Sequence, residues 1–122
     1  MGWGVWKRNM VRKYIPKQGD IAYVNFNPTK GHEQKGLRPC LVISNNIFNK
    51  NTKMVIVCPI TSNEKDFPTH HILTNTKKIH GSVLCEHIRS IDYETRDLKF
   101  IEKCSDEDLL SVIMLVNSCI EE

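Results

Sequence analysis

Short apolar runs of strand length recur along the chain, and polar stretches rich in Gly, Pro, Asn or Lys separate them. In residues 21–26, Ala22, Val24 and Phe26 share one face of a period-two pattern, which is typical of a strand. Apolar density and bounded length predict further strands over residues 38–44, 54–60 and 70–73, and residues 82–91 are β-rich. The pattern therefore predicts a mostly β protein.

The clearest helical pattern follows Ser105 near the end of the chain. Ser105 is a good N-cap, and acidic residues at 106–108 place negative charge in the first turn, where the helix dipole favours it. Apolar residues then recur at helical spacing, at Leu109, Ile113, Val116 and Ile120. We interpret this stripe as a face that packs on the core, with a contribution to a dimer interface as the alternative.

Several short strands with one C-terminal helix favour a small, mostly antiparallel barrel. Residues 45–53 predict a loop or a short turn of helix, residues 75–81 predict a turn, and residues 92–99 fit no element clearly. Residues 1–13 carry two Trp and several basic residues, which indicates a basic arm or extension before a single domain over 14–122.

Composition and charge narrow the class of protein only slightly. A chain of 122 residues suits one domain, and no apolar run approaches the ~20 residues that a membrane-spanning helix requires. The formal net charge is +3, with basic residues concentrated near the N-terminus and acidic ones near the C-terminus. This distribution is compatible with a polyanionic partner and equally with no partner.

Cysteine and histidine spacing predicts neither disulfides nor a metal site. The five cysteines are an odd number without a Cys-x-x-Cys pair, so we expect reduced thiols in a cytoplasmic protein. The five histidines show no His-Glu-x-x-His spacing or comparable ligand pattern. We therefore expect no metal and no cofactor.

The first candidate site is a polar loop bracketed by Gly31 and Gly36 that leads into the apolar run 38–44. Pro39 pushes Arg38 toward extended geometry, so Arg38 is expected at the mouth of a strand, beside a loop that turns easily at its glycines. Arg offers a rigid fork of donors suited to phosphate oxygens, and an ordinary structural ion pair is the alternative.

A second candidate follows the run 54–60, in which Pro59 predicts a strand end, a bulge or an edge. Thr61 and Ser62 come next, at the expected strand tip. The Thr61 hydroxyl could donate to a phosphoryl oxygen, or it could simply close a turn through its own backbone.

A third candidate lies in the β-rich segment 82–91. In a half-buried strand, Glu86 would face away from His87 and Arg89. Buried polar side chains need partners, so these residues form either an internal network or a binding face.

In order and with compatible spacing, several blocks between residues 14 and 120 resemble the MazF/PemK family, the ribosome-independent endoribonuclease toxins of bacterial toxin–antitoxin pairs. The blocks are Gly19-Asp20-Ile21, Phe26-Asn27-Pro28, Gly31-His32-Glu33-Gln34-Lys35-Gly36-Leu37-Arg38-Pro39, Leu41-Val42-Ile43-Ser44, Pro59-Ile60-Thr61 and Glu86-His87-Ile88-Arg89-Ser90-Ile91-Asp92. Where the Gram-positive branch usually has Glu-Gln-Ile-Arg, this chain has His87 in place of the glutamine.

The resemblance implies an SH3-like barrel with a C-terminal helix, a homodimer, and metal-independent cleavage of single-stranded RNA. It implies that Arg38 and Thr61 are catalytic and that Glu33 and Gln34 belong to a loop that covers the substrate. It also implies neutralisation by a small cognate antitoxin peptide. We expect RNA contacts from Glu33, Gln34, His32, Asn27, Ser62, Glu86 and His87.

Two other functions stay open on the sequence alone. The same barrel fold also carries toxins that are not nucleases and that bind and inhibit a topoisomerase. A protein that binds single-stranded RNA without cleaving it is the third reading. The presence of both Arg38 and Thr61 favours the nuclease.

Overall fold

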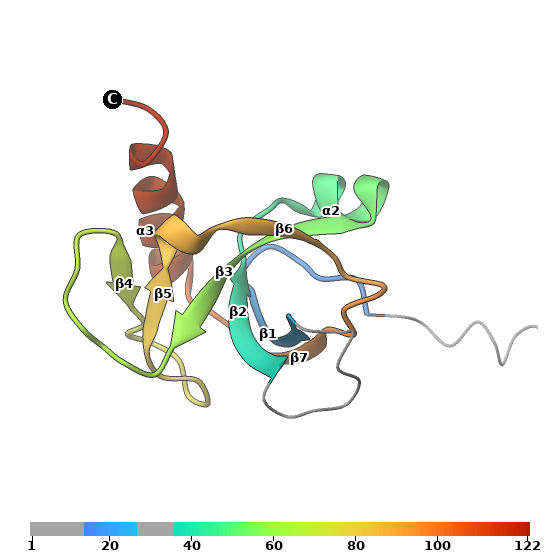
Figure 1. Ribbon diagram of the computed structural model, residues 1–122, viewed down its shortest axis with the longest axis horizontal. Helices are drawn as coiled ribbons and strands as arrows, with labels where there is room; N and C mark the ends of the chain where they lie inside the picture. The colour runs from blue at the N-terminus through green and yellow to red at the C-terminus, as the bar shows by residue number, and fades with distance from the viewer. Residues whose placement is uncertain (1–13, 27–35) are drawn as a thin grey trace, which may run out of the picture.

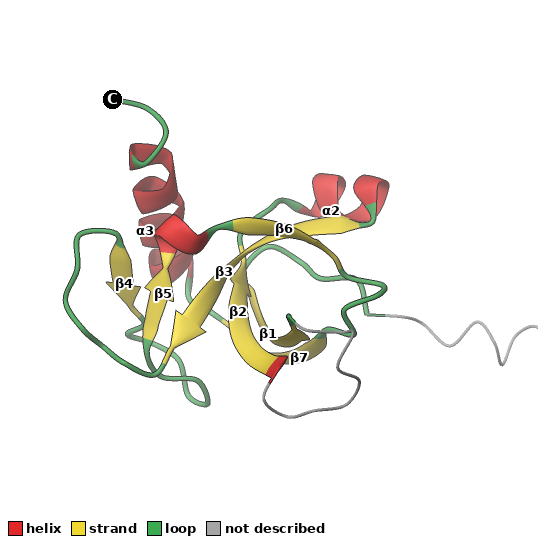
Figure 2. Ribbon diagram, in the orientation of Figure 1, coloured by secondary structure: helices red, strands yellow, loops and turns green. Residues whose placement is uncertain are grey.

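The computed structural model describes residues 14–26 and 36–122 (Figure 1). The predicted arm 1–13 and most of the Gly31–Gly36 loop lie outside the described residues, so the division into an arm and a domain stays a prediction. The elements, shown by type in Figure 2, are β1 (Asp20–Asn25), β2 (Leu37–Val42), α2 (Asn46–Thr52), β3 (Met54–Thr61), β4 (His70–Ile72), β5 (Ser82–Leu84), the 3-10 turn η3 (Cys85–His87), β6 (Arg89–Asp92), β7 (Lys99–Lys103) and α3 (Asp106–Ser118).

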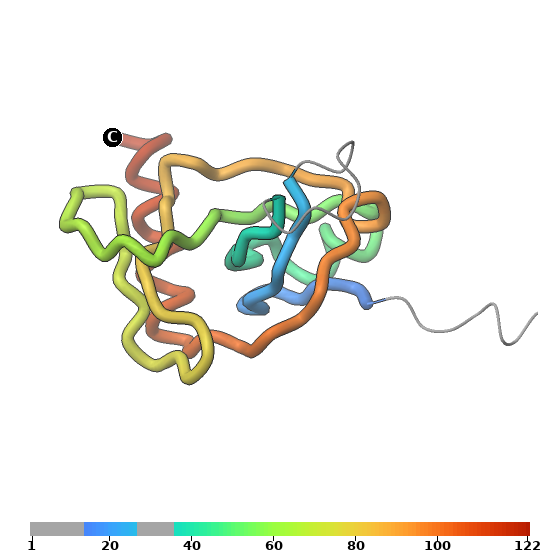
Figure 3. The backbone as a smooth tube through the Cα atoms, turned by 60° about the horizontal axis from the view of Figure 1, so that its bottom comes forward, coloured from blue at the N-terminus to red at the C-terminus, as the bar shows by residue number. Residues whose placement is uncertain are grey.

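The described strands form one seven-stranded sheet in the order β4-β5-β3-β2-β1-β7, with β6 paired to β3 outside this path. Each of the strand pairs within the described residues is antiparallel. The sheet is strongly curved but does not close on itself (Figures 1 and 3). The prediction of a small, mostly antiparallel, barrel-like fold with a C-terminal helix is confirmed.

Strand β3 is the centre of this sheet and the element that positions the site. On one side it pairs with β2, and on the other it pairs first with β6 and then, at its tip, with β5. On this second side, the turn η3 separates β5 from β6 and leaves a gap in the pairing with β3. Pro59 lies opposite this gap. Because proline has no N–H to donate, the gap lets Pro59 sit inside an interior strand.

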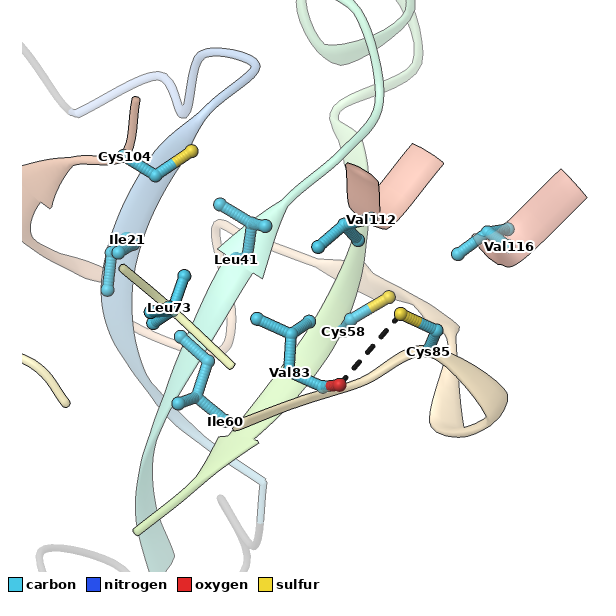
Figure 4. Packing of buried hydrophobic residues seen from close by; sticks show 10 residues of the cluster. All are labelled: Ile21, Leu41, Cys58, Ile60, Leu73, Val83, Cys85, Cys104, Val112 and Val116. Carbon is cyan, nitrogen blue, oxygen red and sulfur yellow. Dashed lines mark hydrogen bonds between the residues drawn. The ribbon is translucent and has the colours of Figure 1, made fainter. Parts of the chain in front are cut away.

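Two groups of buried apolar side chains lie on opposite faces of β1, β2 and β3. The first group faces α3 and includes Ile21, Leu41, Cys58, Val112 and Val116 (Figure 4). The second group lies on the inner face and includes Ala22, Val42, Val57, Ile91 and Tyr93. Since successive residues of a strand face opposite ways, burial on both faces explains the continuous apolar runs in the sequence.

Helix α3 begins where the sequence predicts, but its buried face differs from the predicted stripe. Ser105 accepts a hydrogen bond from the Asp108 N–H at 3.1 Å. The buried positions are Asp108, Val112 and Val116, one turn apart. Ile120 lies beyond the helix and is 74% exposed, so its assignment to the core was wrong.

The β-rich segment 82–91 contains two strands, β5 and β6, which η3 separates, and Glu86 and His87 lie in that turn and not in a strand. The strand β7, over Lys99–Lys103, was not predicted. Among the described strands, β7 pairs only with β1, and its mixed polar sequence and exposed Phe100 lack the alternation that reveals a half-buried strand.

The described cysteines are free thiols, and four of them are buried. Burial raises the pKa of the Cys40 and Cys58 thiols to about 12 and that of Cys85 and Cys104 to about 11. The Cys85 thiol donates a hydrogen bond to the Val83 carbonyl oxygen at 3.8 Å, and Figure 4 marks this bond with a dashed line. Within the described ranges, no helix has the length and apolar character needed to cross a membrane.

Candidate active site

A groove of about 820 Å³ opens where the ends of β2 and β3 meet η3, β6 and the connection between β4 and β5. Its apolar floor includes Leu37, Pro39 and Ile60. Its polar and charged lining comes from four stretches of the chain that are far apart in sequence. These side chains are Arg38, Thr61, Ser62, Lys78, His80, His87 and Arg89. The groove therefore has a cationic lining with no Asp or Glu among the residues described there.

Arg38 is the second residue of β2 and lies opposite Val24 of β1 in the strand ladder. Its side chain is exposed, and no hydrogen bond or ion pair joins it to another described residue. The ladder fixes the backbone while the guanidinium stays available to a ligand. Among the described residues, the alternative of a structural ion pair finds no support.

Thr61 is the last residue of β3, and its Oγ1 accepts a hydrogen bond from the Asn63 N–H at 3.2 Å. The alternative expectation, that the Thr61 hydroxyl closes a turn, is therefore also met. It uses the hydroxyl as an acceptor, so the hydroxyl proton is still available for donation into the groove. Ser62, next to it, is exposed and also lines the groove.

Gly81, the residue before β5, packs closely against the tip of β3. Its φ is +145°, and a Cβ built on it would lie 2.0 Å from the Thr61 carbonyl oxygen. No other residue type fits such an approach without moving the backbone of Thr61. From the sequence, Gly81 was expected only at the end of a turn.

Phe26 and Gly36 lie at the rim of the groove, and the Phe26 N–H donates to the Gly36 carbonyl at 3.1 Å. The Arg89 guanidinium carbon lies 4.7 Å from the centre of the Phe26 ring, a cation–π arrangement. Four predicted contact residues, Asn27, His32, Glu33 and Gln34, belong to the segment between these two rim residues. They lie outside the described residues, so their roles stay predictions.

Glu86 and His87 are adjacent in η3 but take different positions. His87 lines the groove, whereas Glu86 is outside the lining. Glu86 accepts from Thr69 Oγ1 at 2.7 Å and lies 2.8 Å from His70 Nε2 and 3.7 Å from His87 Nε2. Burial raises the pKa of the Glu86 carboxyl, but the bonds from Thr69 and His70 outweigh it, so the pKa lies below its ordinary value. In the described contacts, Glu86 therefore binds Thr69 and two histidines, and its predicted contact with RNA stays a prediction.

Lys78 and His80 line the groove but were not identified from the sequence. They lie in the connection between β4 and β5, which the sequence analysis treated only as a turn. A lysine and a histidine just before Gly81, at the start of a strand, were the only local indication. The described residues contain no group of three or more His, Cys, Asp or Glu side chains placed to hold a metal ion.

The fold and the groove define a small protein with a strongly curved antiparallel sheet and a cationic cleft suited to an anionic ligand. Residues 17–119 match the family model described as the PemK-like, MazF-like toxin of type II toxin–antitoxin systems. The chain therefore belongs to this family.

Named relatives and solved structures agree with this assignment. The endoribonuclease toxin MazF of Escherichia coli (strain K12) is 37% identical over 87 residues, which are 71% of this chain and 78% of that protein. The endoribonuclease toxin ChpB of the same strain is 33% identical over 120 residues, 92% of this chain and 100% of that one. The crystal structure of MazF (Form-I) from Deinococcus radiodurans has a TM-score of 0.77 at 33% identity and covers 88% of this chain and 98% of that chain.

A structure of a MazE–MazF complex (Form-II) from Deinococcus radiodurans has the same TM-score of 0.77 at 29% identity, covering 88% of this chain and 97% of that chain.

Proposed function

We propose that this protein is an endoribonuclease toxin that cuts single-stranded RNA by attack of the RNA's own 2′-hydroxyl. The observation that carries the proposal is the groove in which an exposed Arg38, without an ion pair to any described residue, and the Thr61 hydroxyl lie together in a cationic lining. The names of the relatives support the activity, since both MazF and ChpB are endoribonuclease toxins.

The reaction requires an aligned nucleophile, a stabilised phosphorane and a proton for the leaving group. The 2′-oxygen forms a bond to phosphorus while the bond from phosphorus to the 5′-oxygen breaks. The 2′-hydroxyl proton passes to a base, and the departing 5′-oxygen takes up a proton. The products are a 2′,3′-cyclic phosphate and a 5′-hydroxyl, and the substrate itself supplies the nucleophile.

In this reaction Arg38 stabilises the charge that develops on the phosphorane oxygens, and Thr61 adds a neutral hydrogen bond. Arg38 is a poor general base because a guanidinium stays protonated at any working pH. Glu33, His32 and a bound water are the candidates for the base. Ser62 and His87 lie in the groove to contact the nucleotides on either side of the cut.

Single-stranded RNA is the form that this groove suits. Its lining combines apolar side chains, an aromatic ring at Phe26 and cations, which together bind unstacked bases and a phosphate backbone. The edges of duplex RNA are hidden in a deep, narrow groove. Base-specific cleavage therefore requires splayed bases.

The partners we propose are a second copy of the chain and a cognate antitoxin peptide. Leu110 and Met114 on α3 are 60% and 61% exposed, which leaves an apolar face for another subunit. The MazE–MazF complexes among the similar structures support an antitoxin partner. Buried free thiols fit a reducing compartment, so we place the protein in the cytoplasm.

The test is to incubate the purified protein with a long RNA in excess EDTA and to map new 5′ ends. We expect discrete cuts with 5′-hydroxyl ends, and protection of a cut site that is annealed into a perfect duplex. The Arg38→Ala variant is the control for a contaminating nuclease. No cleavage, or cleavage that needs a restored divalent ion, would overturn the proposal, and binding without cleavage would indicate an RNA-binding protein.

A further inference from the structure

The connection between β4 and β5, residues 73–81, brings two basic side chains to the groove without any regular secondary structure. Lys78 and His80 line the groove, and both are exposed. In Figure 1 this connection lies beside the end of β3, and Gly81 places it against Thr61. The segment is named the β4–β5 loop below.

A single carboxylate from a distant strand holds the backbone of this loop. Glu102 of β7 accepts hydrogen bonds from the N–H groups of Lys77, Lys78 and Ile79 at 3.0, 2.9 and 2.8 Å. Burial raises the pKa of the Glu102 carboxyl, but these three bonds and the positive charge of Lys78 outweigh it, so the pKa lies below its ordinary value. Three consecutive amides on one carboxylate fix the direction in which the peptide groups face.

The two ends of the loop are also fixed. Asp108 of α3 accepts from the Thr74 N–H and Thr74 Oγ1, the latter at 3.0 Å. At the other end, the Leu73 N–H donates to the Gly81 carbonyl at 2.9 Å, which closes the loop. With Gly81 pressed against Thr61, the loop cannot shift without moving the tip of β3.

Lys78 is placed to interact with an anion. No carboxylate of a described residue lies within 4.0 Å of its ammonium group, whereas Lys103 pairs with Asp20 at 2.7 Å. Both oxygens of the neighbouring Glu102 are occupied by backbone N–H groups. The adjacent Lys77 has the same charge but does not line the groove.

We propose that Lys78 binds a phosphate of the RNA strand next to the scissile bond, and that Glu102 is a positioning residue that holds Lys78 there through the loop backbone. This inference rests on the proposed function. It assigns Lys78 to substrate binding and leaves the chemistry to the residues of β2 and β3. Removing Lys78 should therefore weaken binding and leave the rate at saturation almost unchanged.

The experiment compares Lys78→Ala with its matched control, Lys77→Ala, on one RNA fragment that the wild-type protein cleaves. Single-turnover rates over a range of protein concentrations give the half-saturating concentration and the saturated rate. Binding to a 2′-O-methyl copy of the fragment, which lacks the nucleophile, is measured against salt. We expect Lys78→Ala to weaken binding roughly tenfold, as for loss of a charge-assisted hydrogen bond. The slope of log affinity against log salt should fall by ~0.7, as for one lost phosphate contact with a single strand.

Lys77→Ala should match the wild type in both measurements. Glu102→Gln replaces one acceptor oxygen by an amide that cannot accept, so the half-saturating concentration should rise with little change in the saturated rate. Combining Glu102→Gln with Lys78→Ala should add little to Lys78→Ala alone, because both act on the same contact. A merely structural role would instead lower the saturated rate and the melting temperature, and circular dichroism follows the fold.

Equal effects of Lys78→Ala and Lys77→Ala would overturn this inference while the wild type still cleaves, leaving the proposed function intact. Additive effects of Glu102→Gln and Lys78→Ala would overturn the positioning role of Glu102. A wild-type protein that neither binds nor cleaves any RNA tested, so that no such fragment is found, would overturn both proposals.

Discussion

Two sets of polar residues in the groove are held in different ways. Arg38 of β2 is fixed by the backbone ladder with β1, and Thr61 of β3 is fixed by the ladder with β5. Lys78 and His80 lie on the β4–β5 loop, where carboxylates from β7 and α3 bind the backbone. The strand-borne residues depend on pairing with neighbouring strands, and the loop-borne residues depend on Glu102 and Asp108.

This difference suggests that the strand-borne residues serve catalysis and the loop-borne residues serve RNA binding. A reaction that stabilises charge in its transition state needs donors fixed within a fraction of an ångström, and a strand provides such a position. Binding a flexible strand of RNA tolerates more movement, so a loop pinned at a few points is sufficient. The predictions below separate the two sets.

The largest effect is expected for the strand-borne Arg38. Arg38→Ala should lower the single-turnover cleavage rate by ~10²–10³, the scale for losing a donor to transition-state charge. Arg38→Lys should restore little, because a point charge does not replace the planar fork of a guanidinium. Circular dichroism should show an unchanged fold, since the side chain is exposed. A folded Arg38→Ala variant that cleaves at the wild-type rate would place the site elsewhere.

The next effect concerns the α3 anchor of the loop. Asp108 is 1% exposed, and its carboxylate accepts from Thr74 and Asn75 and lies 2.8 Å from His71 Nε2. Asp108→Asn keeps the shape but turns an amide toward these donors, so the free energy of unfolding should fall by about 1–3 kcal/mol. Urea unfolding measures this, with the exposed neighbour Asp106→Asn as the matched control. Equal losses in the two variants would show that only the helix dipole is affected.

The same carboxyl predicts a pH dependence of stability. Burial raises the pKa of Asp108, but the bonds from His71, Thr74 and Asn75 outweigh it and lower the pKa below its ordinary value of 3.8. A carboxyl whose pKa is lower in the folded state stabilises the fold above its unfolded pKa, and this contribution is lost as the pH falls through the folded pKa. The stability difference between wild type and Asp108→Asn should therefore shrink below pH 3.8. A difference that is constant down to that pH and below would contradict this explanation.

The smallest effect is expected for the hydroxyl of Thr61. Thr61→Val keeps the branched shape but removes one neutral hydrogen bond to the phosphorane, which is worth about 0.5–1.5 kcal/mol, or roughly three- to tenfold in rate. The variant also loses the acceptor for the Asn63 N–H, so Thr61→Ser, which keeps the hydroxyl and removes only the methyl group, is the control. A loss as large as that of Arg38→Ala would give Thr61 a role in proton transfer.

The sequence predicted the strand-borne part of the site because its cues are local. The Arg38-Pro39 pair at the start of an apolar run and Thr61 at the end of another mark the ends of strands, and the structure places both residues in one groove. The antiparallel strands and the capped helix followed from period and capping, which are also local.

The loop-borne part could not be predicted in this way. Glu102 and Asp108 lie more than twenty residues from the backbone groups they hold, and nothing in the intervening sequence specifies those pairs. Strand β7, which carries Glu102, was itself missed, because it pairs with β1 alone and exposes Phe100. The break at η3 was missed for a related reason, since the apolar content of 82–91 fits a strand and only tertiary pairing reveals the interruption.

The most direct test of the proposed division is a parallel titration of Arg38→Ala and Lys78→Ala under single-turnover conditions on the same cleavable RNA. We predict that Arg38→Ala lowers the saturated rate with little change in the half-saturating concentration. Lys78→Ala should raise the half-saturating concentration with little change in the saturated rate. If the two variants change the same parameter, or if their effects are exchanged, the strand-borne and loop-borne residues do not divide chemistry from binding.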